Sequence, residues 1–232
     1  MALNRRDFLV TGVKATTALT AMASLPLFMA APAAAESYPI DELLETVELK
    51  SVDPKTNEVT IGKLEDITYG KEDAPVVIVE YFSLTCSHCA HFHETGFKFI
   101  KENYIDTGKV RYIARNFVSD DLALVGAMVT YKIPSGRRTA MLDLLLRQQE
   151  KWAFSKDPLV NLQRLAKFGG FSQKAFEEAT KDQDLVNALN ASRKRANSEF
   201  GVTATPTFFV NGEKYVGAMS DKDFDKILQP LI

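Results

Sequence analysis

The residues of this chain best suited to chemistry are two cysteines, and the sequence contains no others. They stand three positions apart in the segment Cys86-Ser87-His88-Cys89. A thiolate is both a nucleophile and a metal ligand, so such a pair indicates either thiol–disulfide exchange or metal binding. Because no further cysteine is present to form a structural bridge, redox exchange is the interpretation that we favour.

The pair lies between an apolar segment and a helical one. Residues 76–82 are β-branched or aromatic except for Glu80, which predicts a buried strand. Residues 86–102 place apolar side chains at helical spacing and predict a helix. Cys86 would then stand at a helix N-terminus, where unpaired N–H groups and the helix dipole lower the pKa of a thiol. Cys89, one turn along on the same side, is close enough to form a disulfide with it and to act as the resolving thiol.

Two neighbours of the cysteines are candidates to assist them. His88, if protonated, would stabilise the thiolate of Cys86, and a stabilised thiolate makes the disulfide form the stronger oxidant. Glu80 is an acid within an apolar strand. Such a group must be paired, hydrated or protonated, so we interpret Glu80 as a candidate for proton transfer.

The first 35 residues differ in composition from the rest of the chain. Arg5 and Arg6 form a basic head, residues 15–35 carry no charge, and residues 33–35 are alanines. This order predicts an export signal of the twin-arginine type, cleaved near Ala35, and hence a protein of the periplasm. A retained membrane anchor is the alternative, because about 20 apolar residues span a bilayer. Export to an oxidising compartment would suit a catalyst of disulfide chemistry.

The composition of the whole chain is that of a globular protein. Of the 232 residues, 46% are hydrophobic and 25% are charged, which is enough apolar material for a sizeable core. The formal net charge of −2 gives no argument for binding nucleic acid or an acidic membrane surface. Partners must therefore be inferred from the candidate site.

The other segments predict a sheet interrupted by helices. Strands are expected at residues 58–62, 110–117, 206–210 and 213–216, the last two joined by an Asn211-Gly212 hairpin turn. Helices are expected at residues 40–45, 122–132, 137–149, 158–168, 173–180, 184–199 and 221–228, the last behind Ser220 as its N-cap. This order predicts one α/β sheet with an inserted helical domain.

Two motifs together resemble the DsbA-like branch of the thioredoxin superfamily. They are Cys86-Ser87-His88-Cys89 after a strand, and Ala204-Thr205-Pro206-Thr207 before a hairpin. Three further features narrow the resemblance to that branch: residues 73–76 before the strand, His88 as the second residue between the cysteines, and the helical domain inserted before Pro206. It covers roughly residues 66–229 and implies a thioredoxin-like fold with an inserted helical domain.

The resemblance implies a role for each residue of the two motifs. Cys86 matches the exposed nucleophile, and Cys89 matches its buried partner. Pro206 matches the cis-proline that lies against the disulfide, and Thr205 before it matches the residue that presents its backbone to a substrate strand. Glu80 matches the buried acid that assists proton transfer at the second cysteine.

The expected function is that of an exported thiol:disulfide oxidoreductase, which passes its disulfide to exported proteins with free or mispaired thiols. The resemblance implies reoxidation by a DsbB-like membrane redox partner, without a bound cofactor or metal. Ser87 stands where the best-studied DsbA motif has proline, and Thr205 replaces a hydrophobic residue. Since threonine at that place is also familiar in the isomerase branch, a reductase or isomerase acting as the dithiol stays an alternative.

A second alternative comes from another class of protein. Cys86 and Cys89, with His91 or His93, offer ligands that suit copper or zinc, so the chain could be a metal-binding chaperone. Ligands this close on one helix cannot converge without unwinding it, which counts against that alternative.

The expected domain organisation follows from these segments. It comprises a signal peptide at residues 1–35, an N-terminal extension at 36–65, a thioredoxin-like domain in two parts at 66–117 and 201–232, and an inserted helical domain at 118–200.

Overall fold

The computed structural model describes residues 36–53 and 55–232, so the predicted export signal lies outside the described residues. A five-stranded sheet with strand order β3-β5-β4-β6-β7 forms the centre of the described part. The strands are β3 (Ile67–Tyr69), β4 (Val76–Phe82), β5 (Val110–Asn116), β6 (Thr207–Val210) and β7 (Glu213–Val216). β4 and β5 run parallel, and the other neighbours run antiparallel.

β4 is almost wholly buried because helices cover the sheet on both faces and strands pair with both its edges. Its side chains alternate between two apolar clusters. Ile78 and Phe82 pack with residues of the helices that follow the strand and of the insertion. Val79 and Tyr81 pack on the opposite face with the end of a long helix and with Leu43. Glu80 therefore points into the first cluster.

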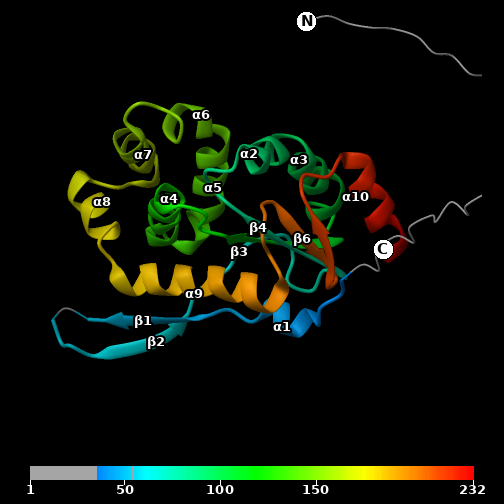
Figure 1. Cartoon of the computed structure of the whole chain (residues 1–232), viewed down its shortest axis with the longest axis horizontal. Coiled ribbons are helices and arrows are strands. Elements are labelled where there is room, and N and C mark those ends of the chain that lie inside the picture. Colours follow the sequence, from blue (N-terminus) through cyan, green and yellow to red (C-terminus); the bar gives the residue numbers. More distant parts are fainter. Residues whose placement is uncertain (1–35, 54) are drawn as a thin grey trace, which may run out of the picture. The chain divides into compact units, whose positions relative to one another are not determined.

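Ten α-helices are described in residues 36–53 and 55–232. They are α1 (Ile40–Leu44), α2 (Ser87–Glu94), α3 (Gly96–Ile100), α4 (Asp121–Lys132), α5 (Arg138–Arg147), α6 (Gln149–Trp152), α7 (Pro158–Ala166), α8 (Gln173–Ala179), α9 (Gln183–Phe200) and α10 (Asp221–Leu228). Helices α4 to α9 lie between β5 and β6 in the chain, and Figure 1 shows α4 to α8 gathered on one side of the sheet. None of the described helices is both long and apolar enough to cross a membrane.

The α/β class and the helical insertion are confirmed. The predicted N-cap at Ser220 is also confirmed, because its hydroxyl accepts the Asp223 N–H and the Asp223 carboxylate accepts the Ser220 N–H. The described residues fall into one compact unit, and the domain boundaries at residues 65, 117 and 200 stay predictions.

The helix predicted over residues 86–102 is interrupted at Thr95. Thr95 has φ −117° and ψ −90°, and its hydroxyl donates to the carbonyl oxygen of His91 at 2.8 Å. Gly96 follows, where a Cβ would lie 2.5 Å from the ring of Phe92. Beyond α3 the chain makes a π-helical segment, Lys101–Ile105. The side-chain bond to the backbone and this close packing end α2 at Glu94, five residues after Cys89, a break that helical periodicity does not reveal.

Two strands were not predicted. β1 (Glu48–Val52) pairs antiparallel with β2 (Val59–Lys63) in a separate ribbon, which Figure 1 shows running beside α9. β3 has three residues on the sheet edge. β1 is too polar, and β3 is too short, to show a clear alternating pattern. The start of the extension packs on the sheet, where the Tyr38 N–H donates to the carbonyl oxygen of Gly212 at 2.8 Å.

Candidate active site

The two cysteines begin helix α2. Cys86 is the N-cap residue in extended conformation, and its carbonyl oxygen accepts the N–H groups of Cys89 at 3.1 Å and Ala90 at 3.2 Å. Cys86 is half-buried, whereas Cys89 is 1% exposed. Both are free thiols in this structure. The helix therefore presents one sulfur to solvent and holds the other in the core.

The surroundings of the two sulfurs move their pKa values in opposite directions. A hydrogen bond from the Cys89 thiol is the largest cause that lowers the pKa of Cys86, to about 5, and it outweighs the partial burial of Cys86. The side chain of Thr205 and the backbone N–H groups of Cys89 and His88 lower it further. Burial raises the pKa of the Cys89 thiol above its ordinary value. At neutral pH Cys86 is thus a thiolate and Cys89 a protonated thiol.

The loop before β6 comes within contact of Cys86 although it lies 119 residues away. The Thr205–Pro206 peptide bond is cis, as the resemblance implies. The Cys86 sulfur is 3.3 Å from the Thr205 carbonyl oxygen. The Pro206 carbonyl oxygen accepts the N–H of Gly217 at 2.8 Å, which holds the loop against the end of β7. Half-buried Thr205 therefore lies beside the reactive sulfur.

Glu80 lies beneath the cysteines with one side-chain partner that the sequence analysis missed. It is 4% exposed and accepts a hydrogen bond of 2.7 Å from the Tyr112 hydroxyl on β5. Burial raises the pKa of Glu80 to about 8, and negative charge on Cys86 raises it as well, although the Tyr112 bond opposes both. The Glu80 charge in turn raises the pKa of Cys89. A protonated Glu80 at neutral pH can exchange a proton with its surroundings.

His88 and Ser87 are exposed on the first turn of α2. The backbone N–H of His88 helps to lower the pKa of Cys86. The electrostatic role of the His88 imidazole stays a prediction.

The other two histidines of α2 differ in their surroundings. His91 is exposed, whereas His93 is buried, pairs with Asp143 of α5 at 3.0 Å, and stacks on Phe97. Asp143 also accepts a 2.7 Å hydrogen bond from Tyr69. Burial opposes ionisation of Asp143, but the bonds from His93 and Tyr69 outweigh it and lower its pKa. His93 therefore ties α2 to the insertion.

In the described ranges no three His, Cys, Asp or Glu side chains converge as metal ligands would.

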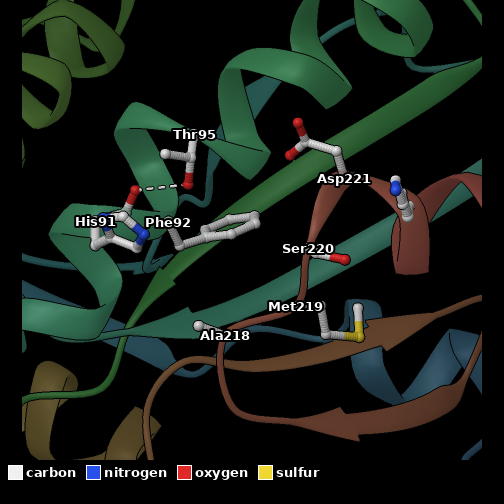
Figure 2. A pocket seen from close by; sticks show the side chains of 8 residues that line it. His91, Phe92, Thr95, Ala218, Met219, Ser220 and Asp221 are labelled. Atoms are coloured by element: carbon white, nitrogen blue, oxygen red, sulfur yellow. Dashed lines mark hydrogen bonds between the residues drawn. The ribbon is translucent and has the colours of Figure 1, made fainter.

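Two clefts border α2. The larger, of about 450 Å³, lies between α2 and the segment that runs into the start of α10, and Figure 2 shows side chains of both around it. It is lined by His91, Phe92, Thr95, Ala218, Met219, Ser220, Asp221 and Lys222. The smaller, of about 190 Å³, lies toward α5 and α6 and includes Ser87. Cys86 lines neither cleft but stands at the start of the helix between them.

A family model described as Thioredoxin matches residues 63–230, which include both motifs and all five strands of the central sheet. The chain belongs to the thioredoxin family. Within that family its likeness is to DsbA proteins. The crystal structure of alpha-DsbA1 from Wolbachia pipientis is 31% identical with a TM-score of 0.68, covering 73% of this chain and 92% of that one.

A curated relative and a further solved structure are also similar to this chain. A protein of Rickettsia bellii, named as a candidate protein-disulfide oxidoreductase, is 34% identical over 171 residues, or 72% of this chain and 65% of that protein. The chain spans less than two thirds of the length of the first such curated relatives. BdbD from Bacillus subtilis, at 19% identity, shares the fold with a TM-score of 0.64, covering 71% of this chain and 91% of that one.

Proposed function

We propose that this chain is an exported thiol:disulfide oxidoreductase that donates its Cys86–Cys89 disulfide to exported proteins with free or mispaired thiols. The observation that carries the proposal is the asymmetry of the pair, a thiolate-forming Cys86 on the surface and a protonated Cys89 in the core. A stabilised Cys86 thiolate favours the dithiol form and so makes the disulfide form oxidising. The names of the Rickettsia relatives agree with this activity.

In the first step a substrate thiolate attacks the sulfur of Cys86 in the disulfide form. A bond forms between the two sulfurs, the Cys86–Cys89 bond breaks, and its electron pair leaves on Cys89. Because burial raises the pKa of Cys89, that sulfur takes up a proton. Glu80, whose pKa burial raises, is a buried acid that can supply it.

In the second step another substrate thiolate attacks the substrate sulfur of the mixed disulfide. The substrate disulfide forms, and Cys86 leaves as the thiolate that its hydrogen bonds stabilise. The substrate has lost two electrons, and the protein ends as the dithiol. Thr205 and Pro206 would receive the substrate backbone beside Cys86, and the larger cleft on α2 would accept neighbouring substrate side chains.

The proposal includes a setting for this cycle. The twin-arginine-type signal would direct the chain to the periplasm and be removed near Ala35. A DsbB-like membrane protein would oxidise the dithiol again, so no resident cofactor is needed. Contact with the membrane would occur only through that partner.

The reduction potential tests the direction of electron flow. Equilibration with glutathione should give a value more oxidising than thioredoxin's, which is about −270 mV. A value at or below thioredoxin's would favour the alternative of a reductase or isomerase. Alkylation of free thiols in cells tests the same point, because the two cysteines of an oxidase should be mostly in the disulfide and should therefore escape alkylation.

Two substitutions test the assigned roles of the cysteines. Cys86→Ala should abolish turnover of a reduced protein substrate, whereas Cys89→Ala in the presence of an oxidant should accumulate mixed disulfides at Cys86. Normal turnover by Cys89→Ala would contradict the proposal. Metal analysis of the reduced protein addresses the chaperone alternative, which a stoichiometric ion lost on Cys89→Ser would support.

A further inference from the structure

One side chain of the helical insertion reaches the turn that carries Cys86. Gln149, the first residue of α6, is 2% exposed. Its side-chain nitrogen donates to the carbonyl oxygen of Leu84 at 2.8 Å and to that of Cys86 at 3.0 Å. A carboxamide nitrogen carries two hydrogens, so these two acceptors match its donors. The contact joins segments more than 60 residues apart in the chain.

Gln149 lines the smaller cleft, with Ser87 and Arg147 among the other lining residues, and its amide reaches from there to the buried Leu84. Leu84 and Trp152 are fully buried, and Gly126 of α4 is packed so closely that a Cβ there would lie 2.9 Å from Leu84. A polar side chain in such a place costs free energy unless its hydrogen bonds are made. Here they are made with the active-site turn, whose other side is held by a 2.5 Å hydrogen bond from Thr85 to Asp120.

The two carbonyl groups that Gln149 contacts set the position of the reactive sulfur. The Cys86 carbonyl oxygen already accepts the N–H groups of Cys89 and Ala90, so Gln149 is its third donor. These contacts fix the peptide plane after Cys86. The same plane sets how the N–H groups of His88 and Cys89 face the Cys86 sulfur, and both groups favour its thiolate form.

We propose that Gln149 is a positioning residue for thiol exchange, which holds the Leu84–Cys86 turn so that the Cys86 sulfur stays within reach of the backbone donors of α2. This inference rests on the proposed function. It assigns the helical insertion a part in the chemistry, because the insertion supplies a side chain that sets the geometry of the nucleophile. Gln149 itself would not touch substrate.

The test compares Gln149→Leu with Gln148→Leu, the same change one position earlier, in the reduced full chain. The thiolate of Cys86 is followed by its ultraviolet absorbance against pH. Gln149→Leu should raise the midpoint by about one unit, a roughly tenfold loss of thiolate below the midpoint. The rate of reaction with an alkylating agent should fall by the same factor there. Gln148→Leu should titrate as the wild type does.

A second variant covers the case in which Gln149→Leu fails to fold. Gln149→Glu keeps the size of the side chain, but its carboxylate cannot donate and adds negative charge near the turn, so it too should raise the Cys86 midpoint. Folded Gln149 variants with the wild-type midpoint would overturn the inference, whatever their melting temperatures. An ordinary thiol midpoint in the wild type would instead count against the proposed function, which separates the two failures.

Discussion

Glu80 and Tyr112 lie on the neighbouring parallel strands β4 and β5, and the tyrosine hydroxyl donates a 2.7 Å hydrogen bond to the glutamate. Both residues are buried, on the face of the sheet that packs against Cys89. The bond favours the ionised carboxylate, while burial favours the protonated one and prevails. The pair thus holds an acid with a pKa of about 8 beneath the reactive cysteines.

Removing the tyrosine hydroxyl should raise the pKa of Glu80 further. In Tyr112→Phe the carboxylate loses its hydrogen-bond donor while burial is retained, so we expect a midpoint above 8. Carbon NMR of the glutamate carboxyl against pH measures it. Tyr69→Phe is the control, since that hydroxyl donates to Asp143. A Glu80 midpoint that falls or stays the same in Tyr112→Phe would contradict the assignment.

Replacing Glu80 should change how stability depends on pH. Because the pKa of Glu80 rises from 4.5 to about 8 on folding, the folded protein binds a proton that the unfolded chain has lost, and stability falls as pH rises through this window. Glu80→Gln removes the effect while keeping the acceptor for Tyr112. In urea unfolding, the free energy of unfolding of the variant should rise relative to that of the wild type as the pH increases. By pH 8 this relative increase should reach a few kcal/mol, on the order of the full pKa shift. A constant difference across this range would refute the prediction.

The lowered pKa of Cys86 predicts the opposite pH dependence for the reduced protein. The pKa of Cys86 is about 5 in the folded protein, which is below that of a thiol in the unfolded chain. The thiolate therefore stabilises the folded protein, and it does so fully only at a pH above the pKa of the unfolded chain. That stability is lost as pH falls through about 5. Reduced wild type should therefore exceed reduced Cys86→Ala in stability at pH 7, and the two should converge near pH 4. Equal differences at both pH values would be inconsistent with a stabilised thiolate.

A buried ion pair on the opposite face of the sheet should affect stability and not the chemistry. Arg115 contacts Asp66 through two hydrogen bonds, of 2.8 Å and 2.5 Å, and both side chains are largely buried. Asp66→Asn leaves the guanidinium without its counter-charge, so we expect a loss of about 3–5 kcal/mol. The Cys86 midpoint should not move.

An exposed pair provides the matched control for that change. Lys98 and Glu102 stand 4.0 Å apart with most of both side chains in solvent. Glu102→Gln should therefore cost no more than about 0.5 kcal/mol. If Asp66→Asn were as mild as Glu102→Gln by urea unfolding, the pair would not be the structural contact described here.

Much of the fold could be predicted because its signals are local. The buried strand at residues 76–82, the hairpin turn at residues 211–212 and the N-cap at Ser220 each depend on residues within a few positions of one another. The break at Thr95 was missed although its contacts are local, because helical periodicity takes no account of the Thr95 hydroxyl's bond to His91 or of the close approach of Gly96 to Phe92. The short strand β3 was missed because its pairing with β5, more than its own pattern, makes it a strand.

The candidate site divides in the same way. The sequence by itself determined that two cysteines begin a helix after a buried strand, because their spacing and the periodicity of residues 86–94 are local properties. Only the tertiary structure added Tyr112 on Glu80 and Gln149 on the turn, and it put beside Cys86 the Thr205 carbonyl that the family resemblance, and no local pattern, had implied there. These contacts join segments 32 to 119 residues apart. Helical and strand periods carry no information about such pairings, which depend on how the sheet and the insertion pack together.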